Sequence, residues 1–188
     1  MKILENFKQH QTASNEIIAE YEVILPTDIL KFWKCYGFGT FLNGYMKSVN
    51  PKDFEKILKE SVSQDYHDAV VLFTTGMSDL IVWHKGYLIL CCYRYGFMTT
   101  IMTRLDLFFR CLKEDQYLAN ELRIAPYFEA VSEYGELEYN EAFGYVPLLA
   151  IGGKESIENL DKVKIREHIL IHSAMIGQID YRGDLVQK

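Results

Sequence analysis

The spacing of hydrophobic positions predicts two helices and a hairpin in the first third of the chain. Apolar residues recur three or four positions apart in segment 25–37, LPTDILKFWKCYG, and Gly37 can end that helix. Segment 50–62, NPKDFEKILKESV, has the same periodicity, and Asn50 is placed to cap its first turn. Between them, residues 38–49 are rich in strand-forming side chains around an Asn-Gly pair that favours a tight turn.

The pattern changes between residues 69 and 103, where four runs of β-branched and aromatic residues are separated by turns that contain glycine. After residue 104 helical periodicity returns in four segments: 105–112, 116–122, 125–135 and about 159–176. The helices flank one run of strands instead of alternating with strands. The sequence therefore predicts an α+β fold, an antiparallel β-meander flanked by amphipathic helices, with a mainly helical C-terminal part.

Composition and charge narrow the classes of function. The 188 residues are 49% hydrophobic and 24% charged, which suits one domain or two tightly packed subdomains. The formal net charge is −6, and the basic residues are scattered among acidic ones. Nucleic-acid backbones attract the opposite charge, so direct DNA or RNA binding is disfavoured. An acidic surface instead favours a basic partner.

The cysteines and the lack of apolar export or membrane segments favour a cytoplasmic protein. Cys35, Cys91, Cys92 and Cys111 show no C-x-x-C spacing, which indicates buried free thiols in a reducing compartment. The N-terminal sequence lacks the apolar core of a signal peptide. The longest uncharged run, 142–153, is shorter than the about 20 residues that span a bilayer.

A glycine pair raises the possibility of a phosphate-binding loop. Gly152, Gly153 and Lys154 follow an apolar run, as in the pattern G-x-x-x-x-G-K-[ST]. However, Leu148 occupies the place of the first glycine, and Glu155 replaces the hydroxyl residue and would repel phosphate. The spacing therefore favours a flexible corner that joins an apolar segment to a helix.

The residue patterns do not indicate a catalytic set. His168 and His172 lie one helical turn apart, but no third metal ligand stands nearby in the sequence. There is no G-x-S-x-G motif, and neither Ser78 nor Ser156 follows a strand in the way a nucleophile elbow requires. The sequence predicts no cofactor, no metal and no catalytic residue.

The distribution of acidic residues is more informative. From residue 124 to residue 153 there are five glutamates and no lysine or arginine. This segment is either a solvated face or a patch complementary to a basic partner. The candidate partner-binding residues are Tyr127, Glu129, Glu133, Tyr134, Glu136, Glu138, Tyr139 and Glu141.

Three stretches, taken in order, resemble one family. LPTDILKFWKCYGFGTFLNGYMKSVNPKDF resembles the GAD-like domain, in which LP, FW, YG-x-G and VNP-x-D recur. TTGMSDLIVW resembles the T-x-x-G-D-L-x-x-W stretch of that domain, although Met77 and Ser78 separate Gly76 from Asp79. NEAFGYVPLLAIGGKESIENLDKVKIREHI resembles the C-terminal region that is usually paired with it, with Asn140 and Ala142 where Asp and Cys are expected.

This resemblance covers roughly residues 20–175 and implies a function. It implies a non-catalytic immunity protein that neutralises a cognate DNase toxin of a type VI secretion system. The partner would be a basic nuclease, with no direct contact to nucleic acid or membrane. It also divides the chain into a GAD-like region, 1–103, and a C-terminal immunity region, 104–188, packed as one compact unit.

A different class of function stays open on the residues alone. The chain could be an enzyme or a small-ligand-binding domain that uses an aromatic pocket lined by Trp33, Trp83 and the meander. Such a site would need perturbed carboxylates or histidines that converge on the pocket.

Overall fold

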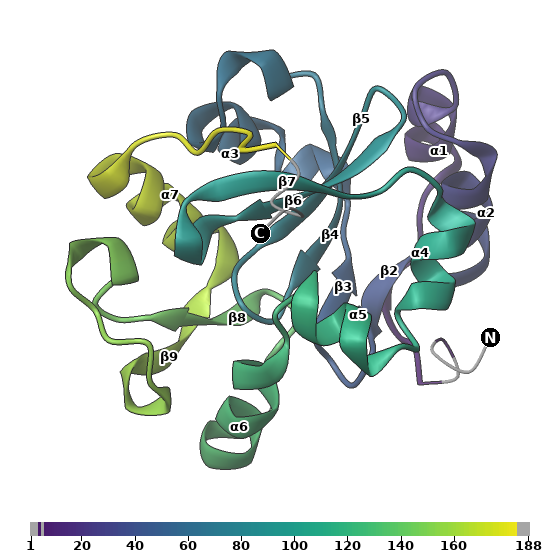
Figure 1. Cartoon of the computed structure of the whole chain (residues 1–188). Helices are drawn as coiled ribbons and strands as arrows, with labels where there is room; N and C mark the ends of the chain where they lie inside the picture. The colour runs from purple at the N-terminus through teal and green to yellow at the C-terminus, as the bar shows by residue number, and fades with distance from the viewer. Residues whose placement is uncertain (1–3, 5, 184–188) are drawn as a thin grey trace.

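A seven-stranded antiparallel sheet forms the centre of the molecule, and its spatial order follows the order of the sequence (Figure 1). The computed structural model describes residues 4 and 6–183. The strands of this sheet are β1 (Lys8–Gln11), β2 (Phe38–Phe41), β3 (Met46–Ser48), β4 (Val70–Thr75), β5 (Leu80–His84), β6 (Tyr87–Cys92) and β7 (Phe97–Met102). Two further strands, β8 (Glu141–Tyr145) and β9 (Leu160–Lys164), pair as a separate antiparallel ribbon.

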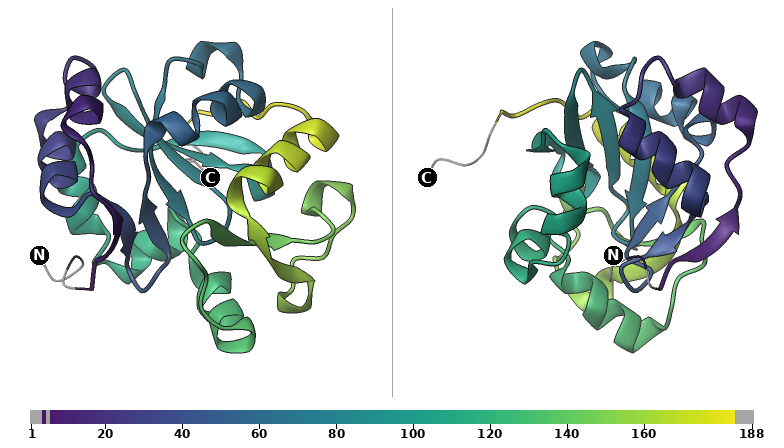
Figure 2. Two further views of the ribbon diagram at one scale, coloured as in Figure 1. Left: turned by 180° about the vertical axis from the view of Figure 1, so that it is seen from behind. Right: turned by 90° about the vertical axis from the view of Figure 1, so that its right-hand side faces the viewer.

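Seven α-helices and five described 3-10 turns connect and cover these strands. The α-helices are α1 (Asn15–Tyr21), α2 (Thr27–Tyr36), α3 (Glu55–Ser61), α4 (Leu105–Cys111), α5 (Asp115–Asn120), α6 (Ala125–Tyr134) and α7 (Ile165–Ile176). The 3-10 turns are η2 (Pro51–Asp53), η3 (Gln64–Tyr66), η4 (Tyr93–Tyr95), η5 (Leu149–Ile151) and η6 (Ile157–Asn159). Helices α1 and α2 lie on one side of the molecule and α7 on the opposite side (Figure 2).

The strands in the middle of the sheet, β4 to β6, are buried on both faces and are mostly apolar on both. Along β6, Leu88, Leu90 and Cys92 belong to the larger core cluster, whereas Ile89 and Cys91 belong to a second one. This alternation follows from the two-residue period of a strand. The larger cluster also contains residues of α1, α2, α4, α5 and α6, and the second contains residues of α3 and α7. Burial of these apolar side chains is the main force that holds the helices on the sheet.

The structure confirms the predicted α+β class, the meander and most of the helices. Helix α2 ends where Gly37 adopts a φ of +69°, a conformation that glycine tolerates better than other residues. Asn43 and Gly44 lie in the turn between β2 and β3, as predicted, and both have positive φ. The helix predicted over 50–62 begins as a 3-10 turn and becomes α-helical only over α3.

The prediction of one helix over about 159–176 is wrong at its start. Residues Leu160–Lys164 form strand β9, and α7 begins at Ile165. Leu160 is buried and Val163 half-buried, and residues 160–164 pair one to one with residues 141–145 of β8 as an antiparallel ladder. The helical spacing of buried positions begins only at Ile165 and continues with Ile169 and His172.

The cysteines agree only in part with the expectation of four buried thiols. All four are free; Cys91 and Cys92 on β6 are buried. Cys35, near the end of α2, is exposed and Cys111 is half-buried. Both lie at helix ends, where one side of the helix faces solvent.

After α7 the chain returns to the sheet and contacts its middle segments. Ile179 forms a parallel bridge with Val62, and Tyr181 forms another with Met98 of β7. The Met98 amide donates to the carbonyl of Asp180 at 2.9 Å. No helix within residues 4 and 6–183 is long and apolar enough to cross a membrane.

Candidate partner-binding surface

Helix α6 carries the first part of the predicted acidic surface. Tyr127 and Ala130 face the core, whereas Glu129 and Glu133, four positions apart, are exposed. Neither glutamate forms an ion pair in the part of the chain that the structure describes. Both side chains can therefore meet positive charge on a partner.

The segment after α6 carries the other three glutamates. Glu136 and Glu138 are exposed, and Lys8 lies 3.6 Å from the Glu136 carboxylate. Such an exposed pair contributes at most about 1 kcal/mol and leaves Glu136 available. Glu141 is half-buried: it accepts the Glu138 amide at 3.1 Å and the Lys164 ammonium at 3.1 Å. The Glu138 amide and then the Lys164 ammonium lower the pKa of Glu141. Through Lys164 the carboxylate links the segment after α6 to β9.

Two of the predicted tyrosines hold the acidic segment in place. Tyr127 is only 2% exposed, and its hydroxyl donates to the carbonyl of Asn43 at 2.9 Å. Tyr139 is half-buried, stacks on His10 with ring centroids 4.0 Å apart, and donates to the carbonyl of Ser48 at 2.7 Å. The structure therefore places Tyr127 in the core, where its side chain cannot reach a partner, and leaves only part of Tyr139 at the surface.

Tyr134 is the predicted tyrosine that is most accessible. Its side chain is 37% exposed at the end of α6, and its hydroxyl donates to the carbonyl of Ile157 at 3.0 Å. Phe128 on the same helix is 47% exposed and was not singled out from the sequence. Aromatic residues are enriched at protein interfaces.

The motif residue Asp79 makes a buried ion pair. Its Oδ2 lies 3.1 Å from Nη2 of Arg94, and the two side chains are 0% and 4% exposed. Its Oδ1 accepts the Tyr93 amide at 3.0 Å, and Arg94 also donates to the carbonyl of Leu122 at 3.1 Å. Within the described residues, Nε and Nη1 of Arg94 have no hydrogen-bond partner. This aspartate therefore links the turn between β4 and β5 to the turn between β6 and β7.

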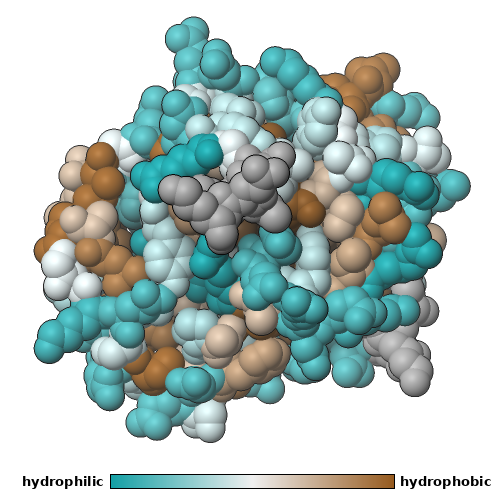
Figure 3. Space-filling view, viewed as in Figure 1, coloured by the Kyte–Doolittle hydropathy of each residue, from teal (hydrophilic) through white to brown (hydrophobic). Residues whose placement is uncertain are grey.

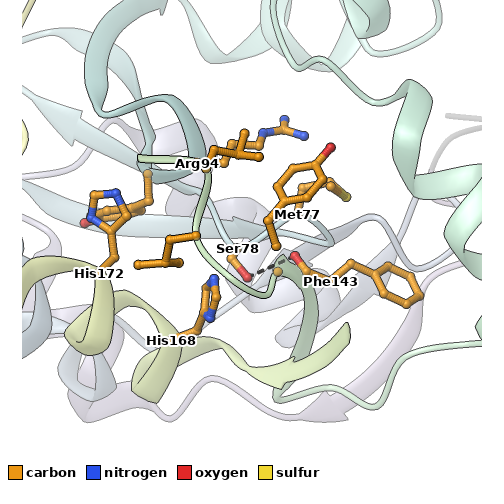
Figure 4. A pocket seen from close by; sticks show the side chains of 11 residues that line it. Met77, Ser78, Arg94, Phe143, His168 and His172 are labelled. Atoms are coloured by element: carbon orange, nitrogen blue, oxygen red, sulfur yellow. Dashed lines mark hydrogen bonds between the residues drawn. The ribbon is translucent and has the colours of Figure 1, made fainter. Parts of the chain in front are cut away.

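A small cavity of about 10 Å³ lies beside this pair, where the sheet meets β8 and α7 (Figure 4). His168, His172 and Arg94 line it, and the Ser78 hydroxyl donates to the carbonyl of Phe143 at 3.1 Å. Burial lowers the pKa of His168 to about 4, so its imidazole is neutral near pH 7. No three described His, Cys, Asp or Glu side chains gather as metal ligands. A space of this size fits about one water molecule.

Lys47 is a buried amine that the sequence analysis did not single out. It lies on β3, is 0% exposed, and its Nζ donates to the carbonyl of Glu138 at 2.8 Å and to that of Glu141. Burial lowers the pKa of this lysine to about 7. Lys47 joins the sheet to the acidic segment through backbone carbonyls, so no pattern of side chains signals the contact.

The glycine pair forms a structural corner. The Gly153 amide donates to the carbonyl of Leu148 at 3.0 Å. A Cβ on Gly153 would lie 2.0 Å from the carbonyl oxygen of Pro147, so only glycine fits without a backbone shift. The corner was predicted, but it leads into η6 and β9 instead of directly into a helix.

The tryptophans proposed for an aromatic pocket belong to the packed interior. Trp33 is 1% exposed, and its ring lies edge-on to Tyr21 and Phe38 with centroids 5.9 and 5.6 Å apart. Trp83 is half-buried and packs against the same cluster. Trp33 therefore contributes to stability and is not accessible to a ligand in this conformation.

Comparison with known families assigns most of the chain. Residues 1–93 match the family described as GAD-like domain, and residues 103–179 match the one described as T6SS immunity protein Tdi1, C-terminal. The fold and the two regions in series define the class, an immunity protein of the type VI secretion system. The C-terminal region therefore belongs to the Tdi1 immunity family, and the N-terminal region to the GAD-like family. No curated protein matches it in sequence.

A solved structure shares the fold. The chain is similar to the crystal structure of Atu4351 from Agrobacterium tumefaciens with a TM-score of 0.70 and 17% sequence identity. The similarity covers 90% of this chain and 86% of that one. It supports the α+β architecture, and at this identity it carries no argument about partners.

Proposed function

We propose that this protein is a non-catalytic inhibitor that binds a cognate secreted toxin, a DNase, and blocks its action. The observation that carries the proposal is the pair of family matches, a GAD-like domain followed by the Tdi1 C-terminal immunity region. The net charge of −6 supports a DNase as the partner, because an enzyme that acts on DNA needs a basic surface.

The acidic surface that we propose for this contact consists of Glu129, Glu133, Glu136 and Glu138 with Tyr134. These side chains are exposed on α6 and on the segment that follows it. Carboxylates on a rigid support can occupy a basic surface that otherwise binds phosphates, which is a form of substrate mimicry. In this proposal Tyr127, Tyr139 and Glu141 hold the acidic segment in position, and they do not supply its main contacts.

Location and organisation are part of the same proposal. We place the protein in the cytoplasm, and its four free cysteines suit a reducing compartment. The toxin is the partner, without direct binding of nucleic acid or membrane. The division into regions 1–103 and 104–188 remains a prediction that follows the two families.

Reversal of the exposed charges tests the acidic surface. The triple variant Glu133→Lys, Glu136→Lys and Glu138→Lys is expected to weaken binding of the protein encoded by the adjacent gene by at least about tenfold, because like charges now meet. Binding is measured by calorimetry at two salt concentrations, and protection by co-expression with that toxin. The salt dependence of binding should fall together with the affinity.

A matched control separates a local effect from a change of net charge. Glu22, Asp65 and Glu114 are exposed, and none forms an ion pair among the described residues. The variant with lysine at these three positions carries the same total charge and should bind as the wild type does. If both triple variants protect equally well, the acidic surface on α6 is not the interface.

A further inference from the structure

The β8–β9 ribbon has an inner edge on β8 and an outer edge on β9. In an antiparallel pair, successive residues of a strand direct their N–H and C=O groups alternately towards the partner strand and away from it. The Ile165 amide donates to the Asn140 carbonyl across the ribbon at 3.1 Å. Residues of β9 at an odd number of positions from Ile165 therefore direct their backbone groups away from β8, and these residues are Leu160, Lys162 and Lys164.

The inner edge of the ribbon is already paired with the rest of the protein. The Phe143 amide donates to the carbonyl of Gly76 at 2.8 Å, and the Phe143 carbonyl accepts the Ser78 hydroxyl at 3.1 Å. The Glu141 carbonyl accepts the amine of Lys47. These bonds use the backbone groups that β8 would offer to a further strand, so the inner edge is closed along these residues.

The outer edge of the ribbon has four free backbone groups. The Leu160 amide donates to the carbonyl of Ile157, and the Lys164 carbonyl accepts the first hydrogen bond of α7. The Leu160 carbonyl, the Lys164 amide and both backbone groups of Lys162 have no hydrogen-bond partner in the part of the chain that the structure describes. Asp161, Lys162 and Lys164 are exposed, so this edge is open to a partner.

The open edge lies beside the acidic surface. The ribbon is at the lower left of the molecule in Figure 1, and Figure 3 shows hydrophilic and hydrophobic side chains side by side over this part of the surface. The Lys162 ammonium donates to the carbonyl of Glu136 at 2.7 Å, so β9 adjoins the segment after α6. An open strand edge accepts an extended segment, whose main-chain hydrogen bonds supply affinity and whose alternating side chains supply specificity.

The side-chain charge along β9 decides between a second copy and a different protein. Lys162 forms no ion pair among the described residues, whereas Lys164 lies 3.1 Å from Glu141. Two copies paired antiparallel through all four free groups would place Lys162 directly opposite Lys162 of the other copy. Like charges directly opposite each other destabilise a strand pair. A segment of another protein with an acidic side chain at that position forms the same backbone bonds and neutralises Lys162.

We propose that the free edge of β9 accepts an extended segment of the cognate toxin as an added strand, with an acidic side chain of that segment opposite Lys162. This inference rests on the proposed function and adds a backbone-mediated contact to the acidic surface on α6. The acidic surface attracts the basic surface of the toxin, and the strand edge fixes the position and direction of the toxin in the complex. The edge belongs to region 103–179, which matches the Tdi1 immunity family.

Proline at position 164 removes one free group and leaves the strand intact. Lys164 has a φ of −77° and a ψ of 122°, values that proline adopts, and Val163 before it is extended, as a residue before proline has to be. Lys164→Pro is expected to weaken binding of the protein encoded by the adjacent gene at least about tenfold relative to Lys164→Ala, because a carbonyl of the toxin loses its donor. Lys164→Ala is the matched control, since it removes the same side chain and its contact with Glu141 but keeps the amide.

The outcomes of this comparison separate the inference from the proposed function. Binding is measured by calorimetry and protection by co-expression, and thermal unfolding checks that both variants are equally folded. If the proline and alanine variants bind and protect equally well, the edge of β9 is not used and the inference is wrong, although the immunity function stands. If the wild-type protein neither binds nor protects against that toxin, the proposed function fails, and the inference fails with it.

Hydrogen exchange gives a direct readout of the added strand. In the free protein the amides of Lys162 and Lys164 should exchange faster than those of Asp161 and Val163, which point to β8. Addition of the toxin should slow exchange at Lys162 and Lys164. Unchanged exchange at these two amides in the complex would overturn the inference.

The oligomeric state shows whether a second copy takes the edge. Light scattering during gel filtration should show a monomer for the wild type and for both variants at position 164. A wild-type dimer that Lys164→Pro loses and Lys164→Ala keeps would assign the edge to self-association and overturn the inference.

Discussion

The variant Asp79→Ala is expected to lower the free energy of unfolding by about 3–5 kcal/mol, because it leaves a buried guanidinium without its counter-charge. Arg94 lies 3.1 Å from Asp79 and its side chain is 4% exposed, so bulk water does not solvate the guanidinium when the carboxylate is removed. The variant also removes the acceptor of the Tyr93 amide. Since small proteins have only about 5–15 kcal/mol of stability, this variant should be close to unfolding at physiological temperature.

Urea unfolding followed by tryptophan fluorescence measures the effect. The double variant Asp79→Ala with Arg94→Met should recover much of the loss, because an apolar pair is often as stable as a buried ion pair. Asp65→Ala, at an exposed position, serves as the control and should change stability little. A loss for Asp79→Ala that is no larger than that of the control would contradict the proposed contribution of the buried pair.

The second large effect is a dependence of stability on pH that comes from Lys47. Burial lowers the pKa of its amine from 10.5 to about 7 in the folded protein. Between these values the unfolded chain binds a proton that the folded protein has released, so stability rises with pH in this window. From pH 7 to about pH 9 this rise amounts to about 2 kcal/mol, given about 1.4 kcal/mol for each pH unit within the window. Below pH 7 the amine is protonated in both states and contributes no slope.

The neutral amine of Lys47 suits its surroundings. It keeps two N–H groups, which match the two carbonyls of Glu138 and Glu141 that it contacts. Urea unfolding of the wild type and of Lys47→Met at a series of pH values measures the effect. The rise between pH 7 and pH 9 should be absent from Lys47→Met. Equal slopes in the two proteins would mean that Lys47 is not the titrating group.

The parts of the fold that sequence reasoning predicted are those with local signals. Helix α2 has apolar spacing and a terminal glycine, and the β2–β3 turn has Asn43 and Gly44, so neighbouring residues determine both. The β8–β9 ribbon was missed because its pairing joins strands that are separated by a long loop. Strand β9, LDKVK, is short and charged, and α7 follows it directly. Because no turn residue separates the two elements, the sequence gives no sign of the boundary at Ile165.

For the candidate surface, the sequence predicts where the acidic residues lie but not which of the neighbouring tyrosines are buried. The positions of Glu129 and Glu133 on one helical face follow from their spacing, and the structure places both at the surface. The burial of Tyr127 depends on its contact with the β2–β3 turn, which no local pattern encodes. An apolar groove between α7 and segment 145–151 had a partial signal in the uncharged run 142–153, but its second wall comes from α7 and is brought there by the fold.

The two edges of the central sheet limit how any partner can be recognised. On one edge, β1 is four residues long, polar and exposed, with an irregular register between Gln9 and Gln11. On the other, the chain near Tyr181 already pairs with Met98 of β7. Short, irregular or covered edges disfavour an added strand, so we expect recognition at the central sheet to rely on side chains and not on backbone ladders. A protein of this design can therefore acquire a new toxin specificity by point substitutions at its surface while the sheet stays unchanged.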